Sequence, residues 1–549
     1  MTTAKAEPAE RTKSAARSKS AAEVQPAAKA QPAAKAQAAA KAQAAAKAPT
    51  AAKAQTAAKT GQAATPIRGR GHGKQSRWPA AGSMSSPAER ASYGKTVRTL
   101  VPREEHAAFD AVADRRDPIG LLESQAPGRL ADLVPVRYGR MSASPFAYFR
   151  GAALPMASDL AKTPATGLLV QACGDAHLSN FGLFGTPERR LVFDINDFDE
   201  TLQGPWEWDV KRLAASIEIA ARENNVATKQ RRRIVLAAVT RYREAMREFS
   251  GADNLDVWYA SLDIDQMQAQ LKQTGRMRKA VDAGVAKARS SDSLRVLGKL
   301  TRVVDGRTQI VSDPPLLVPV RDFTDSQEEA SGLFGMLHEL LASYRHSLPA
   351  DVGELLARYE LADIARKVVG VGSVGTRCWI VLLLAPDGTD PLFLQVKEAE
   401  QSALAQFTGP SRTGPGRTGN QGERVVLGQR YMQAASDIFL GWIRVARGLD
   451  GQQHDYYVRQ LRDWKFSFNV AGMPPDWLQL YGAYCGWTLA RAHAKTGDRF
   501  ALAGYLGSAG IFDEAIADFA ASYADQNERD YAALLDAIKS GRLPCEAGL

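Results

Sequence analysis

Cysteine and histidine are scarce in this sequence, and their scarcity excludes several classes of protein. The 549 residues include 4 cysteines and 7 histidines. Cys173, Cys378, Cys485 and Cys545 lie far apart, so no Cys-x-x-Cys zinc pair exists, and a disulfide framework is not expected in so long a chain. No apolar run is long enough to cross a bilayer, and none stands near the first residue. We therefore expect a cytoplasmic protein with no membrane partner.

Most of the chain has no excess of positive or negative charge, although the formal net charge of the whole sequence is +10. Residues 1–80 contain ten lysines, five arginines and three glutamates, which gives them a net charge of +12. Residues 81–549 therefore have a net charge of −2. A nearly neutral body gives no electrostatic reason to expect a nucleic-acid-binding domain. With 45% hydrophobic residues, the chain is long enough for a buried core in more than one lobe.

Residues 1–85 are rich in alanine, lysine and proline, and their lysines recur every six residues from Lys29 to Lys59. Six residues turn a helix by about 240° net, so these lysines would lie on three sides of it and leave no apolar face to bury. We expect a disordered basic tail. It either makes weak, salt-sensitive contacts with nucleic acid or another polyanion, or only keeps the protein in solution.

The first motif with recognisable chemistry is acidic. Gly-Asp-Ala-His-Leu-Ser-Asn occupies residues 174–180, and Asp-Ile-Asn-Asp-Phe-Asp occupies residues 194–199. Phosphoryl transfer needs a carboxylate near the attacking hydroxyl and magnesium near the phosphates, and magnesium prefers hard oxygen ligands. Asp175 is therefore the candidate catalytic base, and Asn180 and Asp197 are the candidate magnesium ligands. Taken alone, Asp175 and Asn180 would read as turn residues that bond to their own backbone.

The second motif is glycine-rich and lies almost two hundred residues later. Gly370, Gly372 and Gly375 flank Ser373, and glycines let a backbone approach phosphate oxygens closely. Strands are predicted at 367–374, 377–384 and 391–396, with a hairpin turn at 386–388. Because a strand follows the glycines where a dinucleotide-binding fold needs a helix, the Rossmann interpretation fails. Lys397, at the end of the third strand, is the candidate phosphate-binding lysine.

The acidic motif resembles the catalytic loop of aminoglycoside phosphotransferases and choline kinases, which reads His-Gly-Asp-x-His-x-x-Asn. The resemblance implies that Asp175 is the catalytic aspartate and that Asn180 binds metal. It also implies that Asp197 is the main magnesium ligand and that Asp209 braces the loop, with Asp194 left as the alternative to Asp197. Cys173 stands where that family has its first histidine.

The glycine motif resembles the glycine-rich loop of kinases, and Lys397 resembles the lysine of their third strand. A helix predicted from Glu423 to Ala435 would orient that lysine, so Glu423 is the expected partner of Lys397, with Glu398 and Glu400 as rivals. The segment from Arg137 to Gly151 mixes arginines with aromatic residues. We interpret its arginines as structural and paired with carboxylates, with contact to phosphate or substrate as the alternative.

The two motifs stand in the reverse of the usual kinase order, which suggests circular permutation. We therefore expect an α+β, kinase-like fold with two lobes, one mostly helical and one built on a small antiparallel nucleotide-binding sheet. The predicted segments are a disordered tail (1–85), a helical lobe with the catalytic loop (92–365), a nucleotide-binding lobe (366–465) and C-terminal helices that complete the helical lobe (466–549).

The body also resembles one bacterial family, domain of unknown function 2252, which implies no established reaction. The matching stretches include residues 144–146, 174–182, 196–201, 368–375 and 492–494. The residues themselves predict a phosphotransferase that uses ATP and Mg²⁺ on a small-molecule or protein hydroxyl. Two alternatives remain open at this point: a protein that binds nucleotide without catalysis, and a metal-dependent phosphoesterase.

Overall fold

The computed structural model separates residues 1–74 from a second unit, Gln75–Leu549, which is compact. It describes residues 86–109, 114–265, 267, 275–290, 293–323, 327–408, 419–448, 450–461 and 464–549. The tail predicted at 1–85 lies outside the described residues. No described helix is long and apolar enough to span a membrane. The second unit combines many helices with purely antiparallel strand pairs, which confirms the α+β class.

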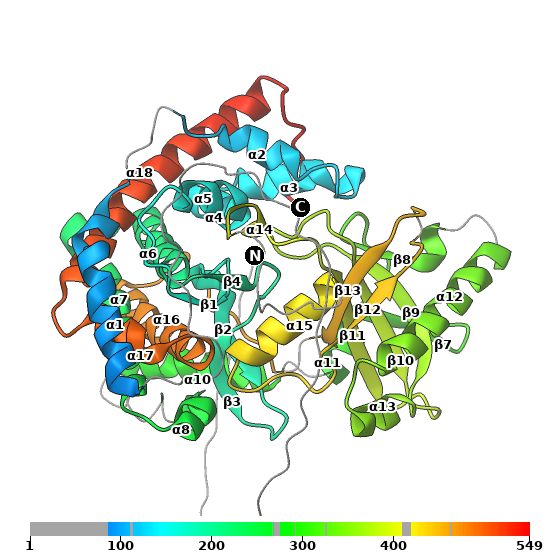
Figure 1. The fold of residues 1–549 in the computed structure, drawn as a ribbon. Coiled ribbons are helices and arrows are strands. Elements are labelled where there is room, and N and C mark those ends of the chain that lie inside the picture. Colours follow the sequence, from blue (N-terminus) through cyan, green and yellow to red (C-terminus); the bar gives the residue numbers. More distant parts are fainter. Residues whose placement is uncertain are drawn as a thin grey trace, which may run out of the picture. The chain divides into compact units, whose positions relative to one another are not determined.

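The largest sheet has six strands in the order β12-β13-β11-β10-β9-β8 (Figure 1). The strands are β8 (Leu317–Pro319), β9 (Glu360–Lys367), β10 (Cys378–Leu384), β11 (Pro391–Glu398), β12 (Gly441–Val445) and β13 (His454–Gln460). The turn predicted at 386–388 does join β10 to β11, and Gly388 there has φ +72°. Successive side chains of a strand alternate between faces, so Val381 and Leu383 belong to one hydrophobic cluster while Ile380 and Leu382 belong to another.

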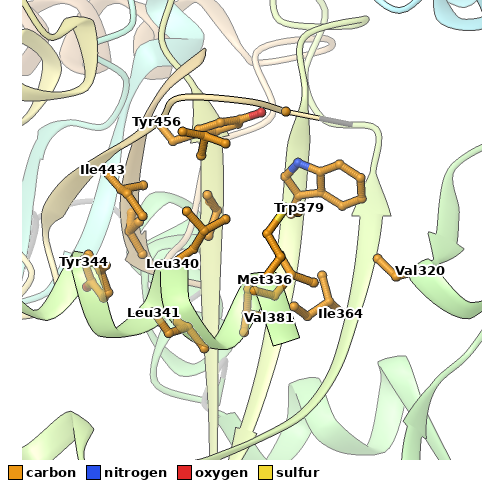
Figure 2. Close-up of a pocket in the computed structure, with 15 residues that line it drawn as sticks. Val320, Met336, Leu340, Leu341, Tyr344, Ile364, Trp379, Val381, Ile443 and Tyr456 are labelled. Atoms are coloured by element: carbon orange, nitrogen blue, oxygen red, sulfur yellow. The ribbon is translucent and has the colours of Figure 1, made fainter. Parts of the chain in front are cut away.

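Both faces of this sheet are covered by preceding segments. Helices α12 (Gln327–Arg345) and α13 (Ala350–Leu356) cover the Val381 face, and helix α11 (Ser293–Leu300) with strands β6 (Thr301–Val304) and β7 (Arg307–Ile310) covers the other. Figure 2 shows Leu340 and Leu341 of α12 facing an apolar cavity that Ile364, Val381 and Trp379 also line. The sheet therefore draws on residues well before 366, and the predicted boundary between residues 365 and 366 runs through β9.

One predicted strand is wrong. Residues 367–374 were expected to be extended, but β9 ends at Lys367 and residues 368–377 form a loop of turns. Gly370 and Gly375 have φ values of +69° and +90°, which an extended strand does not accommodate. The N–H of Leu130 also donates to Gly375 O at 2.8 Å, so contact with a distant segment draws the loop away from strand pairing.

The second part of the unit is helical and is built around one large core. Its main helices are α1 (Pro87–Leu100), α6 (Trp206–Glu223), α7 (Thr228–Ser250), α16 (Pro475–Thr496), α17 (Arg499–Leu506) and α18 (Ile511–Lys539). The sequence predicts helices at 208–222, at 229–249 and from 477 onward, and α6, α7 and α16 lie there. In Figure 1 the first and last segments, blue and orange-red, lie side by side, and α1 packs directly on α17. The C-terminal helices thus share a core with the N-terminal half.

Further elements complete the structure. Around the helical core lie η1 (Arg103–Ala107), α2 (Pro118–Ser124), η2 (Ala131–Leu133), α3 (Val134–Met141), α4 (Pro145–Gly151), α5 (Ala153–Leu160), α8 (Asn254–Tyr259) and α10 (Gly275–Arg289). Strands β1 (Leu169–Ala172) and β4 (Leu202–Pro205) pair, and β2 (Phe181–Gly185), β3 (Leu191–Ile195) and β5 (Leu262–Asp263) form a small sheet. The remaining pieces are η3 (Leu178–Asn180), η5 (Val320–Phe323), α14 (Ala405–Thr408) and α15 (Gln421–Met432).

The contact between α7 and α16 requires glycine. Gly482 and Gly486 are one helical turn apart on α16 and face α7. A Cβ atom on Gly486 would lie 2.1 Å from the carbonyl oxygen of Ala238, well inside van der Waals contact. The two backbones can approach this closely only because position 486 has no side chain.

We expect Gly486→Ala to lower the free energy of unfolding by about 1–3 kcal/mol, because the added methyl group forces α16 away from α7. The measurement is urea-induced unfolding followed by circular dichroism. Gly335→Ala on α12 is the matched control, since nothing lies within 4 Å of its added Cβ. That control should gain about 0.5–1 kcal/mol from helix propensity. Equal effects of the two substitutions would contradict this packing.

Candidate functional site

The acidic loop begins where β1 ends and is held by a carboxylate from α6. Asp209 accepts hydrogen bonds from the N–H groups of Cys173 (2.6 Å) and Gly174 (2.9 Å), which confirms the bracing role expected for Asp209. Gly174 has φ +82°, and a Cβ there would lie 2.3 Å from Glu200 O. The Nε2 atom of His493 on α16, which is fully buried, lies 3.1 Å from Asp209 Oδ2 and helps to hold this carboxylate in place. The loop start is therefore fixed from two sides.

Asp175 is oriented by charge and by the loop itself. Arg212 of α6, almost completely buried, lies 2.5 Å from Asp175 Oδ1. The amide nitrogen of Asn180 donates to the backbone oxygen of Asp175 at 2.6 Å, and His177 Nε2 lies 3.6 Å from Asp175 Oδ2. Burial lowers the pKa of His177 to about 4, against the charge of Asp175 and with the help of Arg150 and Arg212. His177 is thus neutral near pH 7, and Arg212 is the cation that holds Asp175.

Asp194 and Asp197, the two alternatives for the magnesium ligand, have different surroundings. Asp194 is 1% exposed and lies 2.6 Å from Arg491 of α16, and it also accepts from the N–H of Ala434 at 2.8 Å. Asp197 keeps 35% of its side chain exposed and lines a cavity with Asp175 and Asn180. Asp194 is thus committed to a buried ion pair, and Asp197 is the carboxylate that faces open space.

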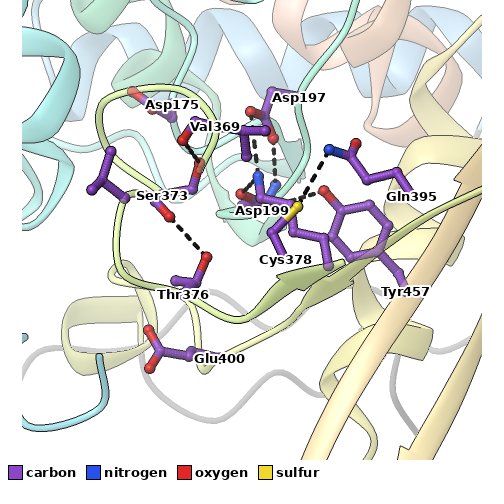
Figure 3. Close-up of polar contacts among 12 residues, drawn as sticks. Asp175, Asp197, Asp199, Val369, Ser373, Thr376, Cys378, Gln395, Glu400 and Tyr457 are labelled. Carbon is purple, nitrogen blue, oxygen red and sulfur yellow. Dashed lines mark hydrogen bonds and ion pairs between the residues drawn. The ribbon is translucent and has the colours of Figure 1, made fainter. Parts of the chain in front are cut away.

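Lys397 connects the sheet to the acidic segment. It is 2% exposed and forms an ion pair with Asp199, while its Nζ lies 3.8 Å from Asp197 Oδ2. Tyr457 of β13 donates from its hydroxyl to Asp199 Oδ1 at 2.8 Å. Figure 3 shows Asp197, Asp199 and Tyr457 gathered at one point beside Val369 and Ser373 of the glycine loop.

The expected partner of Lys397 was Glu423, with Glu398 and Glu400 as rivals, and the structure differs. Among the described residues, the ion pairs of Lys397 go to Asp197 and Asp199. Glu423 lies in the first turn of α15, where its N–H donates to Asn420, and Glu398 pairs with Arg377 and His454. The acidic segment therefore supplies the carboxylate that was expected from the helix.

Burial and neighbouring charges decide the protonation of this cluster. Burial favours the neutral form of Asp197, but Lys397, Arg459 and Lys465 outweigh it and lower its pKa to about 2. Burial likewise opposes the charge of Lys397, yet Asp197 and Asp199 raise its pKa well above the usual value. The lysine and Asp197 are consequently both charged at neutral pH.

The glycine loop folds back against the segment that contains α4. A Cβ on Gly372 would lie 3.2 Å from Arg150 O, and Arg140 donates to Gly370 O at 2.6 Å. Within the loop, Ser373 Oγ donates to Val369 O at 3.3 Å, and Thr376 Oγ1 donates to Ser373 O at 2.8 Å. The loop is thus held in position by contacts with residues more than two hundred positions earlier.

Two cavities meet at this place. The acidic-loop cavity, with a volume near 110 Å³, is bounded by the acidic loop, the glycine loop and the arginines of α3 and α4. The sheet cavity, near 720 Å³, is bounded by β2, the glycine loop, Lys397, α15 and the end of β13. They share a wall of five residues, Arg150, Asn180, Asp197, Gly370 and Ser373.

The structure thus brings most of the candidate residues together. Asp175, Gly372 and Thr376 line the acidic-loop cavity, Lys397 lines the sheet cavity, and Asn180, Asp197, Gly370 and Ser373 line both. Gly375 lies at the base of the glycine loop, where a Cβ would lie 3.0 Å from Arg129 Cβ, and Glu423 lines neither cavity. Whether these residues bind nucleotide or metal stays a prediction.

Sequence reasoning missed the residues that hold the site. Arg212 and Asp199 were given no role, although Arg212 lies three residues beyond Asp209 and Asp199 two beyond Asp197. One helical turn separates Asp209 from Arg212, so a loop bonded to Asp209 also faces Arg212. That spacing was the available signal. The pairing of Asp199 with Lys397 joins positions 198 residues apart and had no local signal.

Comparison with known proteins identifies a family. The model of the family described as "Uncharacterized protein conserved in bacteria (DUF2252)" matches residues 129–537. No curated protein and no solved structure matches the chain. Because the match covers well over half of the sequence, the chain belongs to the DUF2252 family, as its motifs had suggested.

The different surroundings of Asp194 and Asp197 predict different effects of the same substitution. Asp194→Asn leaves Arg491 charged and buried, so we expect a loss of about 3–5 kcal/mol in the free energy of unfolding. Asp197→Asn removes a partly exposed carboxylate and leaves Asp199 beside Lys397, so we expect a change below about 1 kcal/mol. Urea-induced unfolding of the two variants measures this difference. Comparable losses would show that Asp197 is also a structural residue.

Glu200 predicts a dependence of stability on pH. Burial raises its pKa to about 7, although the N–H of Ala403 and the charge of Arg424 favour the carboxylate. The folded state therefore retains a proton that the unfolded state has lost above pH 4.5, and the contribution of Glu200 to stability falls as pH rises toward 7. We expect Glu200→Gln, whose amide oxygen can still accept from Ala403, to unfold at a higher temperature than wild type at pH 8. No difference at pH 8 would contradict a raised pKa.

Proposed function

We propose that this DUF2252 protein is a kinase-like phosphotransferase that uses ATP and Mg²⁺ to phosphorylate a hydroxyl group. One observation carries the proposal. Residues predicted from two distant motifs, Asp175, Asn180 and Asp197 from one and Gly370 and Lys397 from the other, line two cavities with a common wall. In such a reaction the protein mainly positions charges around the phosphates.

The sheet cavity suits the nucleotide. Its volume lies within the usual range for ligand sites, and the glycine loop and Lys397 lie along it. Gln460 and Leu461, at the end of β13, line the same cavity. In the proposed kinase-like fold they would correspond to the end of the strand that leads to the adenine site, which residues 456–461 resemble in sequence. Lys397 would exchange its contact with Asp197 for phosphate oxygens.

The oxygen atoms at the shared wall suit magnesium. Asn180 uses its amide nitrogen to hold Asp175 O, so its amide oxygen is left to act as a ligand. Asp197 supplies an ionised carboxylate, and two protein oxygens complemented by phosphate oxygens and water are usual for Mg²⁺. No group of three His, Cys, Asp or Glu in the described part of the chain could hold a metal ion, so the phosphates would complete the site. Bound magnesium would neutralise charge on the phosphates.

Asp175 is the group that would accept the proton from the acceptor. It faces the acidic-loop cavity. Arg212 holds its carboxylate, and Asn180 holds its backbone carbonyl oxygen. An acceptor hydroxyl in this cavity would lie between Asp175 and the shared wall. Neutral His177 would add no charge that competes for the base.

The proposed fold is a circularly permuted kinase-like core, with the acidic half first and the sheet lobe last. Its support is the sequence of strands β9, β10 and β11 with the glycine loop between the first two, Lys397 on the third, and α15 packed against β12 and β13. We further propose that the protein acts in the cytoplasm and that residues 1–85 make weak contacts with polyanions.

The proposal is tested by nucleotide binding and turnover in matched variants. Mg²⁺-dependent ATP binding, measured by calorimetry, should weaken roughly 10- to 100-fold in Lys397→Met because charged contacts to phosphate are lost. Asp175→Asn should still bind ATP but lose phosphoryl transfer, to a panel of hydroxyl compounds, by roughly 10²- to 10⁴-fold. Lys162→Met, which removes an exposed ion pair with Asp114, is the control and should behave as wild type.

The double variant Lys397→Met/Asp199→Asn separates binding from stability, because it removes the lysine together with one carboxylate. It should fold and still fail to bind ATP. ATP binding without phosphoryl transfer to any acceptor would favour the alternative, a protein that binds nucleotide without catalysis. Absence of ATP binding by the wild-type protein would refute the proposal.

A further inference from the structure

Three arginines line the acidic-loop cavity without a carboxylate partner. Arg129, Arg137 and Arg150 form no ion pair in the residues that the structure describes. The Nε atom of each is buried and makes no hydrogen bond. Burying an arginine charge is costly unless it is paired or hydrogen-bonded. Three arginines around one cavity carry this energetic cost. We therefore expect their positive charge to have a function in the cavity.

The hydrogen bonds that these arginines do make go to neutral oxygens. Arg137, 1% exposed, donates to Gln125 Oε1 at 2.8 Å and at longer distance to the carbonyl oxygens of Leu122 and Gly151. Arg129 donates to Val374 O. These contacts fix the direction of the Arg129 and Arg137 guanidinium groups, and no described carboxylate lies within ion-pair distance of either one. The expectation that Arg137 and Arg150 pair with carboxylates is thus wrong.

Other arginines of the same chain form ion pairs; Arg243 and Arg491 are buried, and Arg115 is partly exposed. Arg115 lies 2.8 Å from Asp159, Arg243 lies 2.9 Å from Asp513, and Arg491 lies 2.6 Å from Asp194. At each of these three sites the chain supplies a carboxylate to the arginine. At the acidic-loop cavity it does not, although the cavity contains several carboxylates.

Those carboxylates are mostly committed to other cations. Asp175 pairs with Arg212, Asp199 pairs with Lys397, and Glu398 pairs with Arg377 and His454. Glu400 is exposed and near Arg129 without forming an ion pair with it. The guanidinium groups of Arg137 and Arg150 thus remain as positive charge on the cavity wall.

We propose that the acidic-loop cavity binds the anionic group, a phosphate or a carboxylate, of a small acceptor molecule that also carries the reacting hydroxyl. This inference rests on the proposed phosphotransferase function. Planar guanidinium groups suit the paired oxygens of both anions. A cavity near 110 Å³ suits a small molecule better than a folded protein surface.

The arrangement also orients the acceptor for reaction. With its anion on the arginines of α3 and α4, the acceptor hydroxyl would point toward Asp175 and the shared wall. The hydroxyl proton passes to Asp175 as the acceptor oxygen bonds to the γ-phosphorus of ATP. The bond from that phosphorus to the bridging oxygen breaks, and ADP leaves with the electron pair.

The test uses inorganic phosphate and acetate as probes of the two anion classes, titrated into the full chain by calorimetry. Binding of at least one probe should weaken about tenfold or more in Arg137→Gln and in Arg129→Gln, because each loses a charged hydrogen bond. These two arginines line only the acidic-loop cavity, whereas Arg150 lines both. Arg222→Gln is the control, since Arg222 is remote and paired with Glu218.

The titrations are repeated with saturating Mg²⁺ and a non-hydrolysable ATP analogue. Anion binding that persists beside the analogue and depends on Arg129 and Arg137 supports the proposal. Competition between analogue and anion, or equal anion binding by wild type and both folded arginine variants, overturns it. Arginine-dependent anion binding in a protein that binds no nucleotide would support the anion site while refuting the phosphotransferase function. Melting temperatures show whether each variant is folded.

Discussion

The ion pair between the buried Lys397 and the partly exposed Asp199 is the contact on which the arrangement of the candidate site depends. It joins the third strand of the sheet meander to the acidic segment, two parts of the chain that are remote in sequence. A buried ammonium is stable only with a partner, so the sheet cannot move away from the acidic segment without leaving a charge unpaired. The candidate lysine and the candidate metal ligand are thereby kept within one ion-pair distance.

Other contacts support the same junction. Arg424 of α15 donates to the carbonyl oxygens of Thr201, Asp199 and Glu400, and Gln433 donates to Ile195 O at 2.7 Å. Arg459 of β13 donates to Asn196 O at 3.2 Å. The acidic segment is therefore bonded to the sheet side along most of its length, while Asp209 and Arg212 fix the preceding loop from the helical side. Its open face is the shared wall of the two cavities.

Local patterns in the sequence predicted much of this. The sequence predicts a helix at 208–222, where apolar residues recur at helical spacing, and α6 (Trp206–Glu223) lies there. It also predicts a strand at 191–195, a short and mostly apolar run, and β3 has the same bounds. The glycine loop was misassigned because Val368, Val369, Val371 and Val374 favour strand locally, while the positive φ of Gly370 and the hydrogen bond from Leu130 are set by tertiary contacts. The partner of Lys397 and the unpaired arginines depend on folding and have no local pattern.

The central claim is that the two motifs converge on one triphosphate. The most direct measurement is a crystal structure of the protein grown with Mg²⁺ and a non-hydrolysable ATP analogue. The account predicts phosphate oxygens in contact with Lys397 and the glycine loop, and a metal ion ligated by Asn180 and Asp197. An analogue bound away from these residues, or a Lys397 that keeps both carboxylate contacts while the analogue is bound, would contradict it.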